Sequence, residues 1–161
     1  MQKVLSYEEL LNEQEQESNI TSFQKIDVRK FVNCAHIGNT KCVKEYVEKG
    51  MDPNIQIELT GATVLHITAQ QGHIETMQYL LSLPSININQ LNNNGETALH
   101  MSAFNRKTAV VKILIENGID YTIKDNKGRT ALDRCDRGNR FYKSCIDILE
   151  NPELYVLTSK L

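Results

Sequence analysis

The stretch Thr-Val-Leu-His-Ile-Thr-Ala at residues 63–69 decides the fold, because a close copy returns 34 residues later as Thr-Ala-Leu-His-Met-Ser-Ala at residues 97–103. A weaker copy, Thr-Ala-Leu-Asp, begins 33 residues further on, at Thr130. A glycine stands two residues before each copy, at Gly61, Gly95 and Gly128. A fixed period near 33 residues indicates a chain built from repeated structural units that stack on one another.

Each copy carries the signals of a pair of helices followed by an extended loop. Thr63 and Thr97 stand where a helix N-cap is wanted, and Leu65 and Ala69 then recur on one helical face. A second apolar pattern follows each copy, with Ile74, Met77, Leu80 and Leu81 after the first and Val110, Val111, Ile113 and Leu114 after the next. Turn residues such as Asn92-Asn93-Asn94-Gly95 then predict an extended finger before the next copy begins.

The motif T-x-L-H-x-x-A at this period resembles the ankyrin-repeat family, over about residues 26–150. The resemblance implies an all-α repeat solenoid of stacked helix–turn–helix units with β-hairpin fingers. The units fall at about 26–59, 60–92, 93–125 and 126–150. It also implies that His66 and His100 bond to the backbone of the neighbouring finger. The residues expected to have structural roles are His66, His100, Thr63, Thr97, Gly61, Gly95 and Gly128.

The first and last units depart from the pattern, as end units with one face in water are expected to do. The first lacks the Thr-x-Leu-His start but keeps Gly38, which matches Gly72 in the second unit. Arg106 stands at that position in the third unit. In the fourth, Asp133 replaces the histidine, and we expect a longer inner turn through residues 136–141. The sequence therefore predicts four helix pairs, with the outer two as caps.

Two segments flank the repeats. Residues 1–24 hold five Glu and one Lys, and Ser6-Tyr7-Glu8-Glu9 fits a capping box, so either a helix over about 7–17 or a frayed acidic tail is expected. At the other end, Asn151-Pro152 should end the last helix and release a tail over 151–161. That tail ends in Ser159-Lys160-Leu161, a sequence that the peroxisomal import receptor recognises. The alternative is that apolar residues 154–157 pack over the last helix pair as a lid.

The composition of the chain and the motifs it lacks exclude several classes of protein. The chain has 161 residues, 40% of them hydrophobic, and a net charge of −2, which predicts a globular chain without strong affinity for nucleic acid. No apolar run is long enough to cross a membrane, and no export signal is evident, so we expect an intracellular protein of the cytosol or nucleus. The four cysteines match no zinc or CxxC spacing, which predicts reduced thiols and no disulfide. No catalytic or nucleotide-binding motif occurs, so we expect no enzyme activity, no cofactor and no metal.

The resemblance places partner binding on the concave face, which inner helices and fingers line. The candidate partner-binding residues are Gln70, Gln71, Phe104, Asn105, Arg129, Arg137, Asn93, Glu96 and Lys127. Phe104 is informative because the same position in the second unit is Gln70; it is either an interface anchor or edge packing over a neighbouring helix. We expect a monomeric, non-catalytic protein-binding module: an adaptor, a stoichiometric inhibitor or an assembly chaperone. The alternative is contact with nucleic acid through the basic residues of 124–143.

Overall fold

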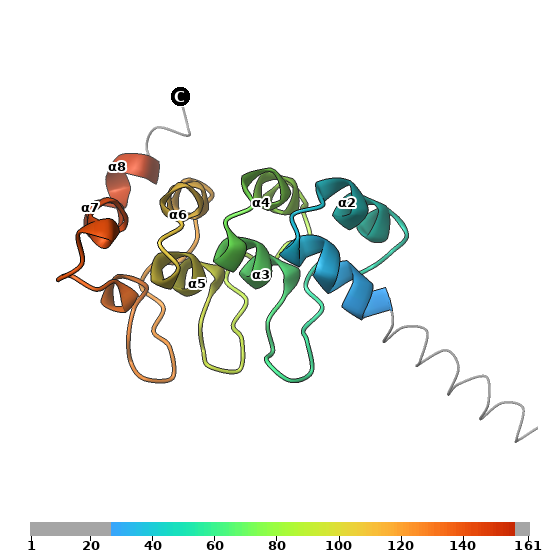
Figure 1. Ribbon diagram of the computed structural model, residues 1–161, viewed down its shortest axis with the longest axis horizontal. Helices are drawn as coiled ribbons and strands as arrows, with labels where there is room; N and C mark the ends of the chain where they lie inside the picture. Colours follow the sequence, from blue (N-terminus) through green and yellow to red (C-terminus); the bar gives the residue numbers. More distant parts are fainter. Residues whose placement is uncertain (1–26, 157–161) are drawn as a thin grey trace, which may run out of the picture.

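A computed structural model describes residues 27–156 and shows two rows of helices with a row of fingers below them (Figure 1). The inner row consists of helical residues 27–36, α3 (Val64–Gln71), α5 (Ala98–Phe104) and the 3-10 turn η1 (Leu132–Arg134). The outer row consists of α2 (Thr40–Glu48), α4 (Ile74–Leu81), α6 (Thr108–Glu116) and α7 (Lys143–Glu150). A second 3-10 turn, η2 (Arg140–Tyr142), precedes α7, and α8 (Glu153–Val156) follows it. The described residues therefore form an all-α repeat solenoid.

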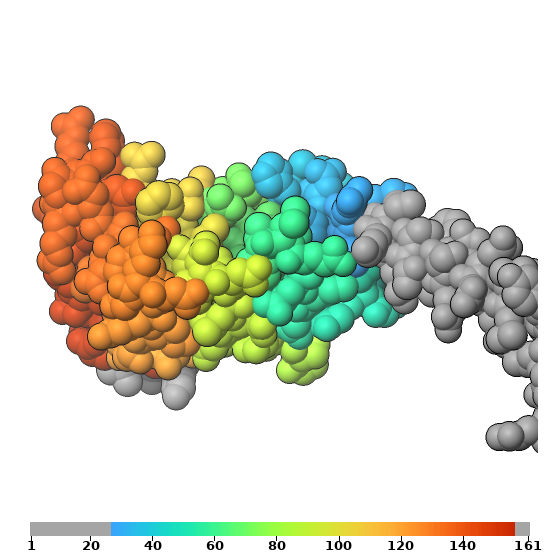
Figure 2. All heavy atoms as spheres, turned by 90° about the horizontal axis from the view of Figure 1, so that it is seen from below, coloured from blue at the N-terminus to red at the C-terminus, as the bar shows by residue number. Residues whose placement is uncertain are grey.

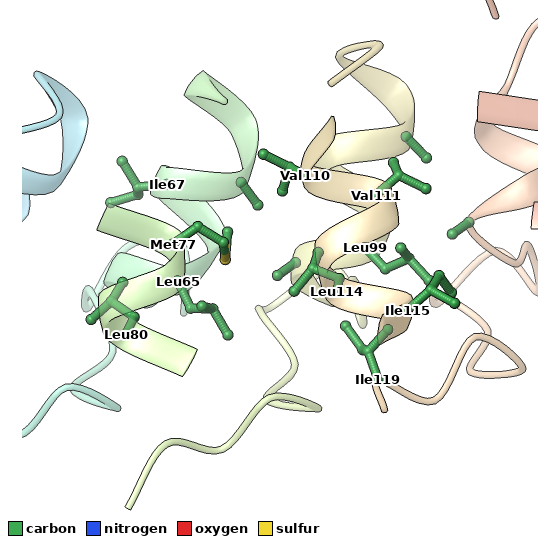
Figure 3. Packing of buried hydrophobic residues seen from close by; sticks show 14 of the residues in the cluster. Leu65, Ile67, Met77, Leu80, Leu99, Val110, Val111, Leu114, Ile115 and Ile119 are labelled. Atoms are coloured by element: carbon green, nitrogen blue, oxygen red, sulfur yellow. The ribbon is translucent and has the colours of Figure 1, made fainter. Parts of the chain in front are cut away.

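The core lies between the two rows and continues from one unit to the next (Figure 3). Its largest fully buried side chains include Leu65, Met77, Leu80, Leu99 and Leu114. Ala69 and Ala103 are fully buried as well, and their small side chains let neighbouring helices pack closely. Because each unit packs on its neighbours, the second and third units bury apolar side chains on both sides.

The fingers differ from the expected β-hairpins, since no strand forms within residues 27–156. The finger of the fourth unit is closed by two backbone bonds, from the N–H of Asp125 to the carbonyl oxygen of Arg129 (2.8 Å) and from the N–H of Gly128 to that of Asp125 (2.8 Å). The Asp125 carboxylate also accepts bonds from the N–H groups of Lys127 and Arg129. Side-chain acceptors thus satisfy backbone donors that a hairpin ladder would use, and this explains why the finger is a turn.

Neighbouring fingers are joined by asparagine residues. The N–H of Asn93 donates to the carbonyl oxygen of Thr60 (2.9 Å), and its side-chain amide donates to that of Leu59 (3.2 Å). Asn126 bonds in the same way to the carbonyl oxygens of Asn94 and Asn93. These bonds hold the three fingers that open the second, third and fourth units, here called the second, third and fourth fingers, side by side, as the view from the finger side shows (Figure 2).

The fourth unit has a shorter inner helix than expected. Only Leu132–Arg134 is helical there, as a single 3-10 turn, so the prediction of a fourth complete helix pair is wrong. Turn-forming residues follow at once, and the Asp136 carboxylate accepts a bond from the N–H of Gly138 (2.9 Å). The long turn expected over 136–141 is present and leads through η2 into α7.

A disulfide joins Cys34 to Cys42, so the prediction of reduced thiols is wrong for this pair. The turn at residues 37–39 folds helical residues 27–36 against α2 and brings the two Cα atoms to 5.8 Å, within the usual range for a disulfide. The spacing matches no motif, because it is the helix–turn–helix geometry that brings the thiols together. Cys135 and Cys145 are free and buried, and burial raises the pKa of Cys135 to about 11.

The start of the expected tail is packed rather than released. α7 ends at Glu150, and Pro152 is buried. Tyr155 and Val156 pack against the core, and the Lys112 ammonium lies 5.7 Å from the Tyr155 ring centroid. Of the two alternatives for this segment, the structure therefore favours the lid for α8. Residues 1–24 and the Ser159-Lys160-Leu161 ending lie outside the described residues.

Candidate protein-binding surface

A Thr–His pair at the start of α3 positions the inner helix and couples it to the next finger. The Nδ1 atom of His66 accepts a bond from the N–H of Thr63 (3.2 Å) and contacts the Thr63 hydroxyl (2.9 Å). Since Nδ1 is an acceptor, the neutral ring carries its proton on Nε2, which donates to the carbonyl oxygen of Glu96 (3.0 Å). The imidazole therefore links two consecutive units.

The third unit repeats this arrangement. His100 Nδ1 accepts from the N–H of Thr97 (3.2 Å), and its Nε2 donates to the carbonyl oxygen of Arg129 (3.1 Å). Burial lowers the pKa of His66 and of His100 below the ordinary value of 6.5, which keeps both rings neutral near pH 7. These contacts are the finger bonds that the sequence resemblance implies.

Gly61 and Gly95 allow the next finger to approach closely. Both have left-handed backbones, with φ of 65° and 73°. A Cβ on Gly61 would collide with the amide of Asn93, and one on Gly95 with that of Asn126. Glycine is therefore required here both by the backbone and by the neighbouring finger.

Phe104 is a large apolar side chain at the end of α5, with 50% of its surface exposed. The Arg134 guanidinium lies 4.5 Å from the centroid of its ring. Asn105 beside it is half-buried and donates its amide to the carbonyl oxygen of Met101 (2.8 Å). On the adjacent helix α3, Gln70 and Gln71 are also half-buried.

A buried charge network fixes Arg134. Its guanidinium bonds to the Glu96 carboxylate (3.0 Å) and lies 3.8 Å from that of Asp125. Arg129 makes two further bonds to Asp125, at 2.7 and 2.9 Å. Burial of Asp125 opposes its ionisation, but the bonds from Arg129 and Lys127 outweigh this and hold its pKa well below the usual range. The network ties the third and fourth fingers to η1.

Several candidate residues lie elsewhere than expected. Glu96 is only 5% exposed and is part of this network, so the expectation of a surface side chain is wrong. Asn93 is exposed, but its amide is used between fingers. Arg137 is not on an inner helix, because η1 ends before it; it pairs with Glu150 of α7 at 2.8 Å. Lys127 is exposed at the tip of the fourth finger.

The structure thus brings together Phe104, Arg134 and the Arg129 pair with Asp125. Arg134 is one of the basic residues of 124–143, but its contact with Phe104 depends on the fold of the fourth unit and is not evident from the sequence. Three arginines of the basic segment 124–143 are paired with carboxylates. This pairing reduces the charge that the segment could offer to a phosphate backbone.

Comparison with known proteins identifies the family. A family model described as ankyrin repeats (3 copies) matches residues 31–125 and again 83–149. The chain belongs to the ankyrin-repeat family. Ankyrin repeats generally mediate protein–protein interaction, and the family is generally non-enzymatic. No helix within residues 27–156 is long and apolar enough to cross a membrane.

Individual relatives share the repeats rather than a whole architecture. The chain is 33% identical to alpha-latrotoxin-Lg1a of Latrodectus geometricus over 56% of its length, which is 7% of that protein. It is 31% identical to human SH3 and multiple ankyrin repeat domains protein 1 over 67% of its length, or 5% of that protein. A putative ankyrin repeat protein of Rickettsia bellii is 32% identical over 63% of this chain and 68% of its own length. The chain therefore spans less than a tenth of the first two relatives.

Proposed function

We propose that this ankyrin-repeat chain is a non-catalytic binding module whose protein partner contacts the concave face, meaning the exposed ends of α3 and α5 with the adjoining fingers. Its role would be that of an adaptor, a stoichiometric inhibitor or an assembly chaperone. The observation that carries the proposal is Phe104, a half-exposed aromatic ring at the end of a helix whose other apolar residues are mostly buried.

The fold gives no packing reason for an aromatic ring at this position. The equivalent residue of the second unit is Gln70, and Phe104 does not belong to the buried core. Instead its ring is held by Arg134, whose guanidinium is held in turn by Glu96. An aromatic side chain beside a fixed arginine is the composition typical of residues that dominate binding energy at protein interfaces.

Charge on the fourth finger would add selectivity. Lys124 and Lys127 are exposed there, and within the described residues neither forms an ion pair. The second and third units have no lysine or arginine from residue 51 to residue 105. A partner with an apolar side chain that contacts Phe104 and carboxylates that face the fourth finger would complement this uneven distribution of positive charge. Its association with the chain would be faster at low salt.

Affinity capture with matched variants tests the proposal. Proteins bound by the full chain are compared by quantitative mass spectrometry with those bound by Phe104→Gln and by Leu154→Gln. Leu154 is 62% exposed on α8 and serves as the control for loss of an exposed apolar side chain. We expect a partner that Phe104→Gln fails to retain and that Leu154→Gln retains. A set of bound proteins that is the same for all three chains would contradict binding through Phe104.

A further inference from the structure

The long turn of the fourth unit presents an exposed aromatic ring beside two arginines. Phe141 is 61% exposed. The Arg140 guanidinium lies 5.1 Å from its ring centroid, and that of Arg106, from the turn between α5 and α6, lies 5.9 Å from it. Arg106 is also 5.9 Å from the ring of Tyr142, whose hydroxyl donates to the carbonyl oxygen of Phe104 (2.8 Å). Residues from two units thus meet at this edge.

Arg106 occupies a backbone position that favours glycine. Its φ is +57°, and it is the non-glycine residue with positive φ in the described chain. Gly38 and Gly72 hold the same position in the first two units, with φ of 74° and 87°. A residue with a Cβ is less stable there by about 1–2 kcal/mol. The fold alone would be served better by glycine, so the guanidinium itself needs an explanation.

These two arginines lack the carboxylate partners that others on the fourth unit have. Within residues 27–156, neither Arg106 nor Arg140 forms an ion pair, whereas Arg129, Arg134 and Arg137 all do. Arg140 also lines a shallow open pocket with Lys143, Arg137 and the half-buried Ile146. Glu150 is the carboxylate in that pocket, and it pairs with Arg137. The edge therefore combines surplus positive charge with apolar surface.

We propose that Arg106, Arg140, Phe141 and Lys143, named here the arginine patch, form a second docking site for an acidic segment of a partner protein in which carboxylates flank an aromatic or aliphatic residue. Guanidinium groups match carboxylates in two-point hydrogen bonds. The Phe141 ring and Ile146 supply contact for the intervening apolar side chain. The patch is formed by the turn after α5 and the turn before α7, so it adjoins the end of α5 but consists of residues outside the proposed concave binding face.

A short acidic peptide fits the patch better than a nucleic acid does. Beyond the patch, residues 51–105 have no Lys or Arg, and the rest of the third unit adds only Lys107, Lys112 and Lys124. The stretch 51–105 instead presents the exposed carboxylate of Glu75 on α4. Binding to nucleic acid depends on successive phosphate contacts, which this surface does not offer beyond the patch.

Fluorescence anisotropy on the full chain tests this site. The probe is a fluorescein-labelled peptide of alternating Glu and Phe, compared with a matched peptide of Gln and Phe and with labelled oligothymidine. The variants are Arg140→Gln, Arg106→Gly and both together. Lys44→Gln is the control, because Lys44 is an exposed cation stacked on an aromatic ring elsewhere, 5.2 Å from the Tyr79 centroid.

We expect the acidic peptide to bind, with affinity at least about tenfold lower in the double variant and unchanged in Lys44→Gln and in Phe104→Gln. The unchanged Phe104→Gln result separates this site from the concave face. Equal binding of the Gln peptide, an unchanged affinity in the double variant, or tighter binding of oligothymidine through the same arginines would overturn the proposal. So would a marked loss of stability in Arg106→Gly, because Arg106 would then act by holding the fourth unit in place.

Discussion

The third and fourth units begin with the same Thr-Ala-Leu but differ in the next residue, and this difference separates an internal repeat from a terminal one. His100 of the third unit accepts from the N–H of Thr97 and donates to the finger of the fourth unit. Asp133 of the fourth accepts from the N–H and hydroxyl of Thr130 and, within residues 27–156, bonds to no further finger. A carboxylate caps its own unit, whereas an imidazole also couples it to the next.

Glycine shows the same contrast. Gly95 and Gly128 have the same φ of 73°, but a Cβ on Gly95 would collide with Asn126 and one on Gly128 would meet open space. The fourth unit keeps the backbone of a repeat without a neighbour to pack against. Its inner helix is reduced to the single 3-10 turn η1, and the turn that follows exposes Arg140 and Phe141 to solvent.

The largest difference between the units should appear when their buried leucines are truncated. Leu99 is 1% exposed, so Leu99→Ala should lower the free energy of unfolding by about 2–5 kcal/mol. Leu132, the equivalent residue of the fourth unit, is half-buried, and Leu132→Ala should cost about half as much or less. Urea titration measures both; equal losses, or a loss below about 1 kcal/mol for Leu99→Ala, would contradict the assigned repeat alignment.

The two glycines form a matched pair for finger packing. Gly128→Ala introduces only the strain of a left-handed backbone, about 1–2 kcal/mol. Gly95→Ala adds a clash with the next finger, about 1–3 kcal/mol more. The expected order is therefore a greater loss of unfolding free energy for Gly95→Ala. Thermal or urea unfolding compares the two variants. Equal losses of unfolding free energy would contradict the close packing of the third finger against the fourth.

The capping residues should differ by a smaller amount. His100→Ala leaves the N–H of Thr97 and the carbonyl of Arg129 without this partner, and we expect a loss of about 2–3 kcal/mol. Asp133→Ala removes an exposed cap and should cost about 1 kcal/mol. Chemical denaturation at pH 7 compares them, and a greater loss for Asp133→Ala would reverse the interpretation of the fourth unit as a terminal cap.

The two kinds of cap should also respond to different ranges of pH. Burial lowers the pKa of His66 and His100, so the unfolded chain binds more protons than the folded chain as the pH falls through about 6.5, and stability decreases there. Bonds from Thr130 lower the pKa of Asp133, so its contribution is lost only as the pH falls below about 4. The free energy of unfolding, measured between pH 7 and pH 5, should decrease as the pH falls. This decrease should disappear when both histidines are replaced by Gln. If the same pH dependence persists in that variant, groups other than these two histidines cause it.

The sequence was sufficient for what depends on one unit and its repetition. The helix pairs of the second and third units and the end of α7 at Glu150 follow local patterns. The finger bonds of His66 and His100 join neighbouring units and were implied by the resemblance to the ankyrin-repeat family. It was not sufficient where residues from different elements meet. The Cys34–Cys42 disulfide, the burial of Glu96 and the stacking of Arg134 on Phe104 depend on how helices and fingers pack in space.

The central claim is that Phe104 serves binding rather than packing. Phe104→Gln places at this position the residue type that the second unit has at Gln70. The most direct test measures, on this one variant, both the free energy of unfolding in urea and the affinity for the captured partner. We predict a stability loss below about 1 kcal/mol together with an affinity at least about tenfold weaker. A stability loss of about 2 kcal/mol or more, with the affinity per folded molecule unchanged, would show that Phe104 is a packing residue and contradict the claim.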